Sequence, residues 1–241
     1  MLYSILMFLA WFLGIIVALF LFFWALAFVL RLPVFSIKAQ NFIAKIGFPF
    51  LIFFMRIKTV VVGRENIPKI YPEGYCIVSN HQSAYDIGAL VAQFPDPVAF
   101  IAKKELRQVP FLGSWMITIG CLFIDRNNMR QSLDTITRLG SQKVRDGQPM
   151  IIFPEGTRNR QNKLGKFRPG SLRMATEAKA PIVPVTMVNS FMAWRGYPFK
   201  SQTVTMHVHP IIPYETYKDM KITELCDMIE DIIASSLPNE E

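Results

Sequence analysis

The sequence predicts an α/β fold, with a mixed, largely parallel sheet flanked by helices and an N-terminal hydrophobic, membrane-anchoring helical segment. Three observations predict it. From Lys58 onward, short apolar runs alternate with helical stretches, a pattern typical of strands joined by crossover helices. The first 30 residues carry no charged side chain, and 51% of all residues are hydrophobic. We therefore expect a membrane anchor with interfacial helices over residues 1–57 and an α/β domain over residues 58–241.

The uncharged N-terminal segment is long enough to cross a bilayer. As one helix, residues 1–30 would measure about 45 Å, against about 30 Å for the hydrocarbon core. A cleaved signal peptide is disfavoured because no basic residue precedes the apolar stretch. Basic residues after the segment predict that the following domain lies on the cytoplasmic side.

Two further elements belong to this region. An amphipathic helix is expected over residues 35–46, because Lys38, Asn41 and Lys45 form one polar stripe. The apolar residues 48–55 are too few to span a bilayer, so they indicate an interfacial or re-entrant segment. Ordinary packing of both elements onto the α/β domain is the alternative.

The charge is unevenly distributed along the chain. The formal net charge is +8, and no Asp or Glu precedes Glu65, whereas the rest of the chain is nearly balanced. A basic excess beside an apolar N-terminus favours anionic lipid headgroups as the partner. No pattern typical of nucleic-acid binding is present, so we expect no nucleic-acid partner.

The α/β domain is divided into alternating elements. Strands are expected over residues 59–62, 75–78, 98–102, 122–124, 150–153, 182–188 and 203–208. Helices are expected over residues 84–93, 129–145, 170–178 and 222–233.

The sequence predicts no metal site. Cys76, Cys121 and Cys226 are scattered, which indicates buried apolar roles in a reducing compartment. His207 and His209 alternate on one expected strand, but no third ligand is nearby. A G-x-S-x-G motif is also missing, which disfavours a serine hydrolase of the nucleophile-elbow type.

Residues 80–86 place an ionisable His and an Asp where a strand gives way to a helix. His81 and Asp86 are too far apart in sequence to meet as helix neighbours. With Ser83 as N-cap, however, Asp86 becomes the acidic residue of a capping box, and its carboxylate turns back toward the preceding loop. Asp86 can then hold one imidazole nitrogen of His81 and leave the other as a base. The alternative is a capped helix with a solvated loop histidine.

Polar side chains also follow three other apolar runs. Residues 153–158 combine Glu155, Gly156, Thr157 and Arg158 at the end of an expected strand, where a glycine allows close approach to a ligand. Lys104 and Arg126 follow apolar runs in the same way. These cations can converge on one anion if the strand ends lie together, although each alone is typical of a solvated surface charge.

Four stretches together resemble the motif blocks of the glycerolipid acyltransferases, specifically the lysophosphatidic acid acyltransferases of bacteria. The N-H-x-x-x-x-D block is residues 80–86, and the second resembles residues 104–106 through 123–126. The third is residues 153–158 and the fourth residues 182–185. Their order and spacing also match, and the resemblance covers about residues 58–210.

The resemblance implies transfer of a fatty acyl group from acyl-CoA or acyl-carrier protein to the sn-2 hydroxyl of lysophosphatidic acid, which gives phosphatidic acid. It implies His81 as general base and Asp86 as the carboxylate that orients it. It assigns to the phosphate side of the pocket Arg126, Glu155, Gly156, Thr157 and Arg158, with Lys104 as a further candidate. We expect Glu155 to hold Arg158 or Arg126 in place, since a carboxylate repels a phosphate.

The same resemblance implies no cofactor and no metal, because a thioester already carries a good leaving group. It implies an enzyme of the inner (cytoplasmic) membrane, with its active domain on the cytoplasmic side and the bilayer as a partner. Two alternatives remain open: another acceptor, such as glycerol-3-phosphate or a different lysophospholipid, and an inactive membrane-tethered lipid-binding protein.

Overall fold

The computed structural model describes residues 57–238, except 70–72, 96–97, 110–111 and 194–200, together with scattered helical positions between Met7 and Ala25. Within that part of the chain, no helix combines the length and the hydropathy needed to cross a bilayer. The elements expected over residues 35–46 and 48–55 lie outside the described residues. The membrane anchor therefore stays a prediction.

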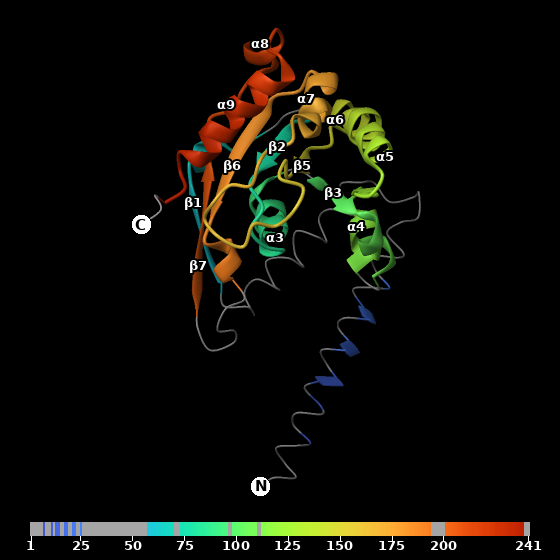
Figure 1. Cartoon of the computed structure of the whole chain (residues 1–241). Helices are drawn as coiled ribbons and strands as arrows, with labels where there is room; N and C mark the ends of the chain where they lie inside the picture. Colours follow the sequence, from blue (N-terminus) through green and yellow to red (C-terminus); the bar gives the residue numbers. More distant parts are fainter. Residues whose placement is uncertain are drawn as a thin grey trace.

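A seven-stranded sheet forms the centre of the α/β domain, in the order β1-β7-β6-β2-β5-β3-β4 (Figure 1). Neighbouring strands are parallel except β6 and β7, which are antiparallel. The predicted mixed, largely parallel sheet is thus confirmed. Its strands are β1 (Ile57–Val62), β2 (Cys76–Ser79), β3 (Ala99–Lys103), β4 (Leu122–Ile124), β5 (Met150–Ile152), β6 (Ile182–Val188) and β7 (Gln202–Val208).

The three central strands are buried along their whole length. Every residue of β2, β5 and β6 is buried, and in the register of the sheet Val78 lies between Ile152 and Pro184. Continuous apolar runs of this kind are expected where both faces of a parallel sheet are covered. The sheet is therefore a rigid base for the segments that leave its strands.

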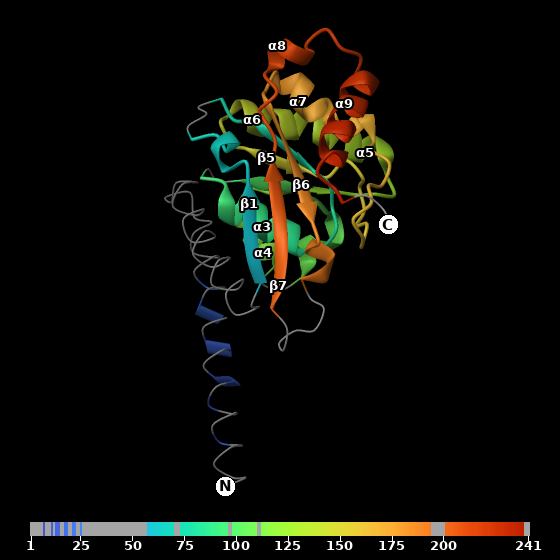
Figure 2. The same cartoon turned by 90° about the vertical axis from the view of Figure 1, so that its left-hand side faces the viewer.

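Helices cover the sheet on both sides. In both views α3 lies on one side of the strands and α9 on the other (Figures 1 and 2). The helices described are α3 (Tyr85–Gln93), α4 (Leu112–Thr118), α5 (Met129–Asp134), α6 (Ser141–Arg145), α7 (Arg173–Ala178), α8 (Tyr214–Tyr217) and α9 (Ile222–Ala234).

Two details differ from the helices expected. The helix expected over residues 129–145 is widened in its middle to a π-helical segment, Thr135–Gly140, which joins α5 to α6. Two further elements, α4 and the 3-10 turn Lys104–Gln108 before it, were not predicted from the sequence. Both follow β3 and lead into β4.

The direction of the strands brings the motif blocks together. Because β2, β3, β4 and β5 run parallel, their carboxyl ends meet at one edge of the sheet. His81 follows β2, Lys104 follows β3, Arg126 follows β4, and the segment with Glu155 and Arg158 follows β5. The fold thus brings the first three motif blocks to one edge of the sheet, and the fourth, residues 182–185, lies in β6 beside β2.

Candidate active site

The junction between β2 and α3 folds back on the first turn of α3. The helix begins at Tyr85, so Ala84 and not Ser83 occupies the N-cap position. Ser83 still acts as a local cap, because its Oγ accepts a hydrogen bond from the backbone N–H of Tyr85 at 3.0 Å. The Asp86 carboxylate turns back and accepts hydrogen bonds from the backbone N–H groups of Gln82 and Ser83, at 2.7 and 2.8 Å. The expected reversal of the Asp86 side chain is present.

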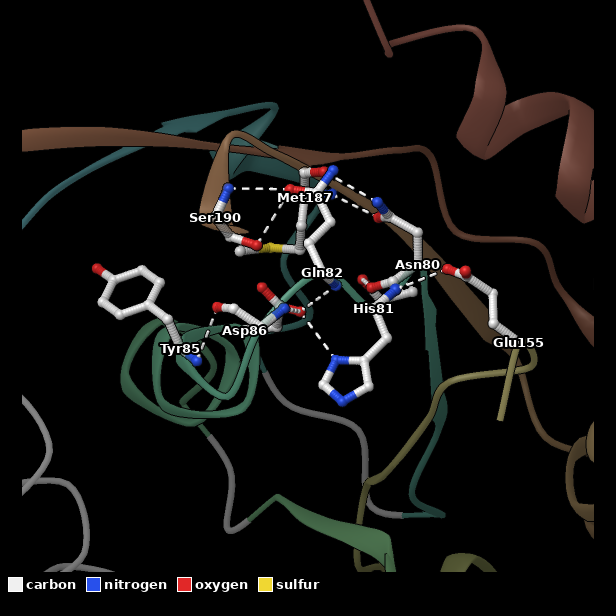
Figure 3. Close-up of polar contacts among 10 residues, drawn as sticks. Asn80, His81, Gln82, Tyr85, Asp86, Glu155, Met187 and Ser190 are labelled. Atoms are coloured by element: carbon white, nitrogen blue, oxygen red, sulfur yellow. Dashed lines mark hydrogen bonds and ion pairs between the residues drawn. The ribbon is translucent and has the colours of Figure 1, made fainter. Parts of the chain in front are cut away.

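His81 and Asp86 form a buried pair. Asp86 Oδ2 lies 2.9 Å from His81 Nδ1, and the side chains are 0% and 8% exposed, respectively. An ionised carboxylate can only accept, so Nδ1 carries the proton in this contact. Nε2 of a neutral His81 then has the free lone pair, and Figure 3 shows it on the side of the ring away from Asp86. This is the arrangement of a general base with its orienting acid.

Phe153 fixes the plane of the imidazole. Its ring stacks on that of His81 with centroids 4.0 Å apart and an interplanar angle of 20°. The stacked ring covers one face of the imidazole and restricts its rotation. Phe153 directly follows β5, so the neighbouring parallel strand supplies this contact.

The backbone of His81 is held from both sides by the segment after β5. Its N–H donates to Glu155 Oε1 at 2.8 Å, and its carbonyl accepts from the backbone N–H of Asn159 at 2.7 Å (Figure 3 draws the Glu155 contact). The other oxygen of Glu155, Oε2, accepts from the backbone N–H of Gly165 at 2.9 Å. The segment that carries Arg158 therefore also positions the base.

Glu155 differs in this respect from the role expected for it. Both carboxylate oxygens bind backbone N–H groups and neither binds Arg126 or Arg158, because the side chain is buried beside His81. Burial raises the pKa of Glu155, although the N–H groups of His81 and Gly165 oppose the rise.

A buried amide network, which sequence reasoning missed, fastens the same loop to β6. Asn80 Nδ2 donates to the carbonyl of Met187 at 2.9 Å, and its Oδ1 accepts from the N–H of Met187 at 2.7 Å. Gln82 Oε1 accepts from the N–H of Ser190 at 2.9 Å, and its Nε2 donates to Asn162 at 3.0 Å. The Asn80 side chain thus extends the pairing of β2 with β6 one residue beyond the end of β2. The loop is held to β6 and the residues after it at two positions, Asn80 and Gln82.

The basic residues form a separate group beside the His81 and Asp86 pair. Burial and the charges of Arg158 and Arg168 lower the pKa of Arg126, so the three arginines lie close enough to act on one another electrostatically. Arg168 was not selected from the sequence, because it lies ten positions after Arg158 and no local pattern links them. Thr157 is exposed between Gly156 and Arg158, and Gly156 has a φ of 69°, which glycine adopts without strain.

Lys104 lies in a different environment from the three arginines. Its Nζ is 2.5 Å from Asp125 Oδ2, in an exposed ion pair. A carboxylate already neutralises this cation, so it is a weaker candidate for a phosphate ligand than Arg126 or Arg158.

The histidine His209 and the three cysteines, which are potential metal ligands, have other roles in the structure. His209 Nε2 lies 2.8 Å from Thr186 Oγ1, and the three cysteines are buried free thiols. Among the residues that the structure describes, no three His, Cys, Asp or Glu side chains are grouped as metal ligands.

The residues of this site lie in a region that matches a known protein family. Residues 58–188, more than half of the 241-residue chain, match the model of the family described as Acyltransferase. The chain belongs to the acyltransferase family. The resemblance drawn from the motif blocks is therefore confirmed, and the His81 and Asp86 pair lies inside the matched region of this acyltransferase.

Several relatives of this acyltransferase carry one name. The 1-acyl-sn-glycerol-3-phosphate acyltransferase of Borreliella burgdorferi is 33% identical, over 75% of this chain and 72% of that protein. That of Saccharomyces cerevisiae is 32% identical, over 73% of this chain and 59% of that protein. The probable 1-acyl-sn-glycerol-3-phosphate acyltransferase of Mycoplasma pneumoniae is 39% identical, over 56% of this chain and 50% of that protein. The matches therefore span between half and about three quarters of these relatives' own lengths.

A solved structure has the same fold. The crystal structure of the 1-acyl-sn-glycerophosphate (LPA) acyltransferase PlsC from Thermotoga maritima superposes with a TM-score of 0.69 at 25% sequence identity. The match covers 82% of this acyltransferase and 79% of that chain.

Proposed function

We propose that this acyltransferase moves a fatty acyl group from a thioester donor to the sn-2 hydroxyl of lysophosphatidic acid, which gives phosphatidic acid. The observation that carries the proposal is the buried pair of His81 Nδ1 and Asp86 Oδ2 at 2.9 Å, beside a group of arginines. His81 accepts the proton of the hydroxyl, and the arginines bind the phosphate of the same acceptor. The shared name of the relatives supports this choice of substrate.

The reaction needs one proton acceptor and no covalent enzyme intermediate. His81 Nε2 takes the proton of the acceptor hydroxyl as its oxygen attacks the thioester carbonyl carbon. The C–O bond forms, the C–S bond of the tetrahedral intermediate breaks, and the imidazolium returns its proton to the leaving thiolate. Asp86 stabilises the imidazolium between these steps and keeps the ring in the required tautomer.

The basic group orients the acceptor. A guanidinium presents paired N–H donors that match phosphate oxygens. With the phosphate bound at Arg126 and Arg158, the glycerol hydroxyl can extend toward His81, since the segment that carries Arg158 also binds the His81 backbone through Glu155 and Asn159. Phosphate binding and placement of the base thus depend on the same segment.

We also propose a membrane location with acyl-CoA or acyl-carrier protein as donor and no cofactor. The acceptor and the product are lipids, and large apolar side chains are exposed at helical positions near the N-terminus: Met7, Trp11, Leu13, Val17, Leu21 and Phe22. The uncharged segment of residues 1–30 then anchors the enzyme to the inner membrane, and the basic residues after it place the catalytic domain on the cytoplasmic side.

One assay tests the proposed function. The purified full-length protein is incubated with labelled acyl-CoA or acyl-carrier protein and with a panel of acceptors: lysophosphatidic acid, glycerol-3-phosphate and other lysophospholipids. Phosphatidic acid formed from lysophosphatidic acid alone is the expected result. Product from another acceptor alone would replace the proposed substrate, and binding of lysolipids without any transfer would indicate an inactive lipid-binding protein.

A further inference from the structure

Arg168 is held next to the segment that carries Arg158, although ten positions separate them in the sequence. Its backbone N–H donates to the carbonyl of Pro154 at 3.1 Å, which brings the chain back to the end of β5. A Cβ atom on Gly156 would lie 3.5 Å from both Cζ and Nε of Arg168. The Arg168 guanidinium therefore lies next to the space that a side chain at position 156 would occupy.

Within the part of the chain that the structure describes, no carboxylate forms an ion pair with the three arginines. Among the described residues, the side chains of Arg126, Arg158 and Arg168 form no ion pair and no hydrogen bond, although Glu105 acts at longer range on Arg126. The lysines of the same region differ, since Lys103 pairs with Glu105 at 3.3 Å and Lys104 pairs with Asp125 at 2.5 Å. Like charges that face one another without a counter-ion repel, so the group is suited to an anion that comes from outside the chain.

We propose that Arg168 is a third ligand of the acceptor phosphate and that it makes the site select a phosphomonoester over a phosphodiester. The proposal rests on the proposed function, since it assigns a residue to the acceptor of that reaction. A phosphomonoester carries between one and two negative charges near neutral pH and three terminal oxygens, whereas a phosphodiester carries one charge and two such oxygens. The charge and the three terminal oxygens of the lysophosphatidic acid headgroup therefore suit three guanidinium groups. A diester, with one negative charge, neutralises less of their positive charge.

The location of Arg168 gives it access to the third phosphate oxygen. Arg126 and Arg158 come from the ends of β4 and β5, while Arg168 approaches over Gly156 from the end of the following loop. A Cβ atom at position 156 would be in ordinary van der Waals contact with the Arg168 guanidinium, so the positive φ of 69° and not a lack of space favours glycine there.

The test compares wild type with Arg168→Gln, Arg168→Lys and the control Arg173→Gln, an exposed arginine five residues further along. The KM for lysophosphatidic acid, the KM for the donor and kcat are measured, together with the Ki of the same lysolipid methylated on its phosphate. We expect Arg168→Gln to raise the acceptor KM about tenfold, with the donor KM and the Ki of the diester changed less than about twofold. Arg168→Lys should lie between, and Arg173→Gln should match wild type.

Two outcomes overturn the inference. An unchanged acceptor KM in Arg168→Gln would make Arg168 an uninvolved surface residue, and an equal rise in the KM and in the diester Ki would make it a general electrostatic contributor. The equilibrium dissociation constants of both lysolipids are measured in parallel for wild type and Arg168→Gln. The change for the monoester is compared with the change for the diester. If wild type shows no transfer to lysophosphatidic acid, the proposed function fails, while these dissociation constants still decide the role of Arg168.

Discussion

The Glu155 carboxylate accepts a hydrogen bond from the backbone N–H of His81 at 2.8 Å, across 74 positions of the sequence. This contact joins the segment after β5 to the loop after β2, and Asn159 adds a second contact to the carbonyl of the same histidine. One segment therefore turns Glu155 inward to the base and leaves Arg158 exposed for the acceptor. The two motif blocks act as one unit.

Glu155→Gln tests whether this contact positions the base. A glutamine has one oxygen, so it can accept from His81 or from Gly165 but faces the other N–H with a donor. We expect the free energy of unfolding to fall by about 1–3 kcal/mol, because one buried N–H loses its partner. We also expect kcat to fall roughly tenfold to a hundredfold through displacement of His81, with both KM values little changed.

Glu230→Gln is the matched control for this variant. Glu230 Oε2 accepts from the backbone N–H of Phe167 at 3.4 Å, in the same loop but without contact to His81. Its kcat should equal that of wild type. A Glu155→Gln enzyme that loses stability but keeps wild-type kcat would show that Glu155 supports the fold alone.

Asp86→Asn tests the electrostatic part of the catalytic pair. Asp86 Oδ2 accepts three hydrogen bonds, while Oδ1 is buried with no partner in the described structure. An asparagine can keep its oxygen at the Oδ2 position, so the loop geometry survives but the charge that stabilises the imidazolium is lost. We expect a folded protein with kcat reduced on the order of 10²–10⁴-fold, and His81→Ala should be at least as impaired. Near-normal turnover by either purified variant would rule out the base mechanism.

Arg158→Ala and Lys104→Ala separate a free cation from a paired one. Arg158 has no counter-ion among the described residues, whereas Lys104 is bound to Asp125 at the surface. Loss of a charged hydrogen bond to phosphate corresponds to about 1.5–3 kcal/mol, so Arg158→Ala should raise the acceptor KM roughly tenfold to a hundredfold. Lys104→Ala should change it less than about threefold. Steady-state kinetics with varied lysophosphatidic acid measure the acceptor KM of both variants. An equal rise in KM for the two would show that Lys104 also binds the phosphate.

Much of the site was predictable because its signals are local. The run of β-prone residues before Asn80, the capping pattern from Ser83 to Asp86 and the polar end of β5 are all contiguous in sequence. Parallel strands bring such ends to one edge, so His81, Asp86 and Arg158 could be grouped before the structure was known. The strand bounds were also close to those expected, because the central strands are continuous apolar runs.

The partners of individual polar groups were not predictable in the same way. Charge alone suggested that Glu155 holds an arginine, yet its carboxylate binds two backbone N–H groups, which no sequence pattern displays. The position of Arg168 depends on how the loop after Arg158 closes on Pro154. The pairing of Asn80 with Met187 depends on the neighbouring strand, 107 positions away. These are tertiary relationships, and each needs the sheet order to be known.

The lowered pKa of His209 predicts a pH dependence of stability that is separate from catalysis. Its Nε2 contacts Thr186 Oγ1, and Thr186 Oγ1 donates to the carbonyl of Ile233 at 2.7 Å, so the hydroxyl accepts from a protonated Nε2. Burial, and then the nearby His207, lower the pKa of His209 in the folded protein. Because the unfolded chain then binds a proton more readily, this histidine lowers the free energy of unfolding as the pH falls through the unfolded pKa of about 6.5.

His209→Gln should remove this dependence, since a glutamine amide can donate to Thr186 but does not titrate. Urea unfolding between about pH 8 and pH 5 measures the difference between wild type and the variant, which cancels the contribution of the carboxylates common to both. We expect wild type to lose more stability than His209→Gln on acidification, with the gap opening below about pH 6.5 and continuing down through the lowered folded pKa. His207→Gln, made alongside, should reduce the same loss partly, because burial also lowers the pKa of His207. Parallel curves for wild type and His209→Gln across the whole range would contradict the lowered pKa of His209.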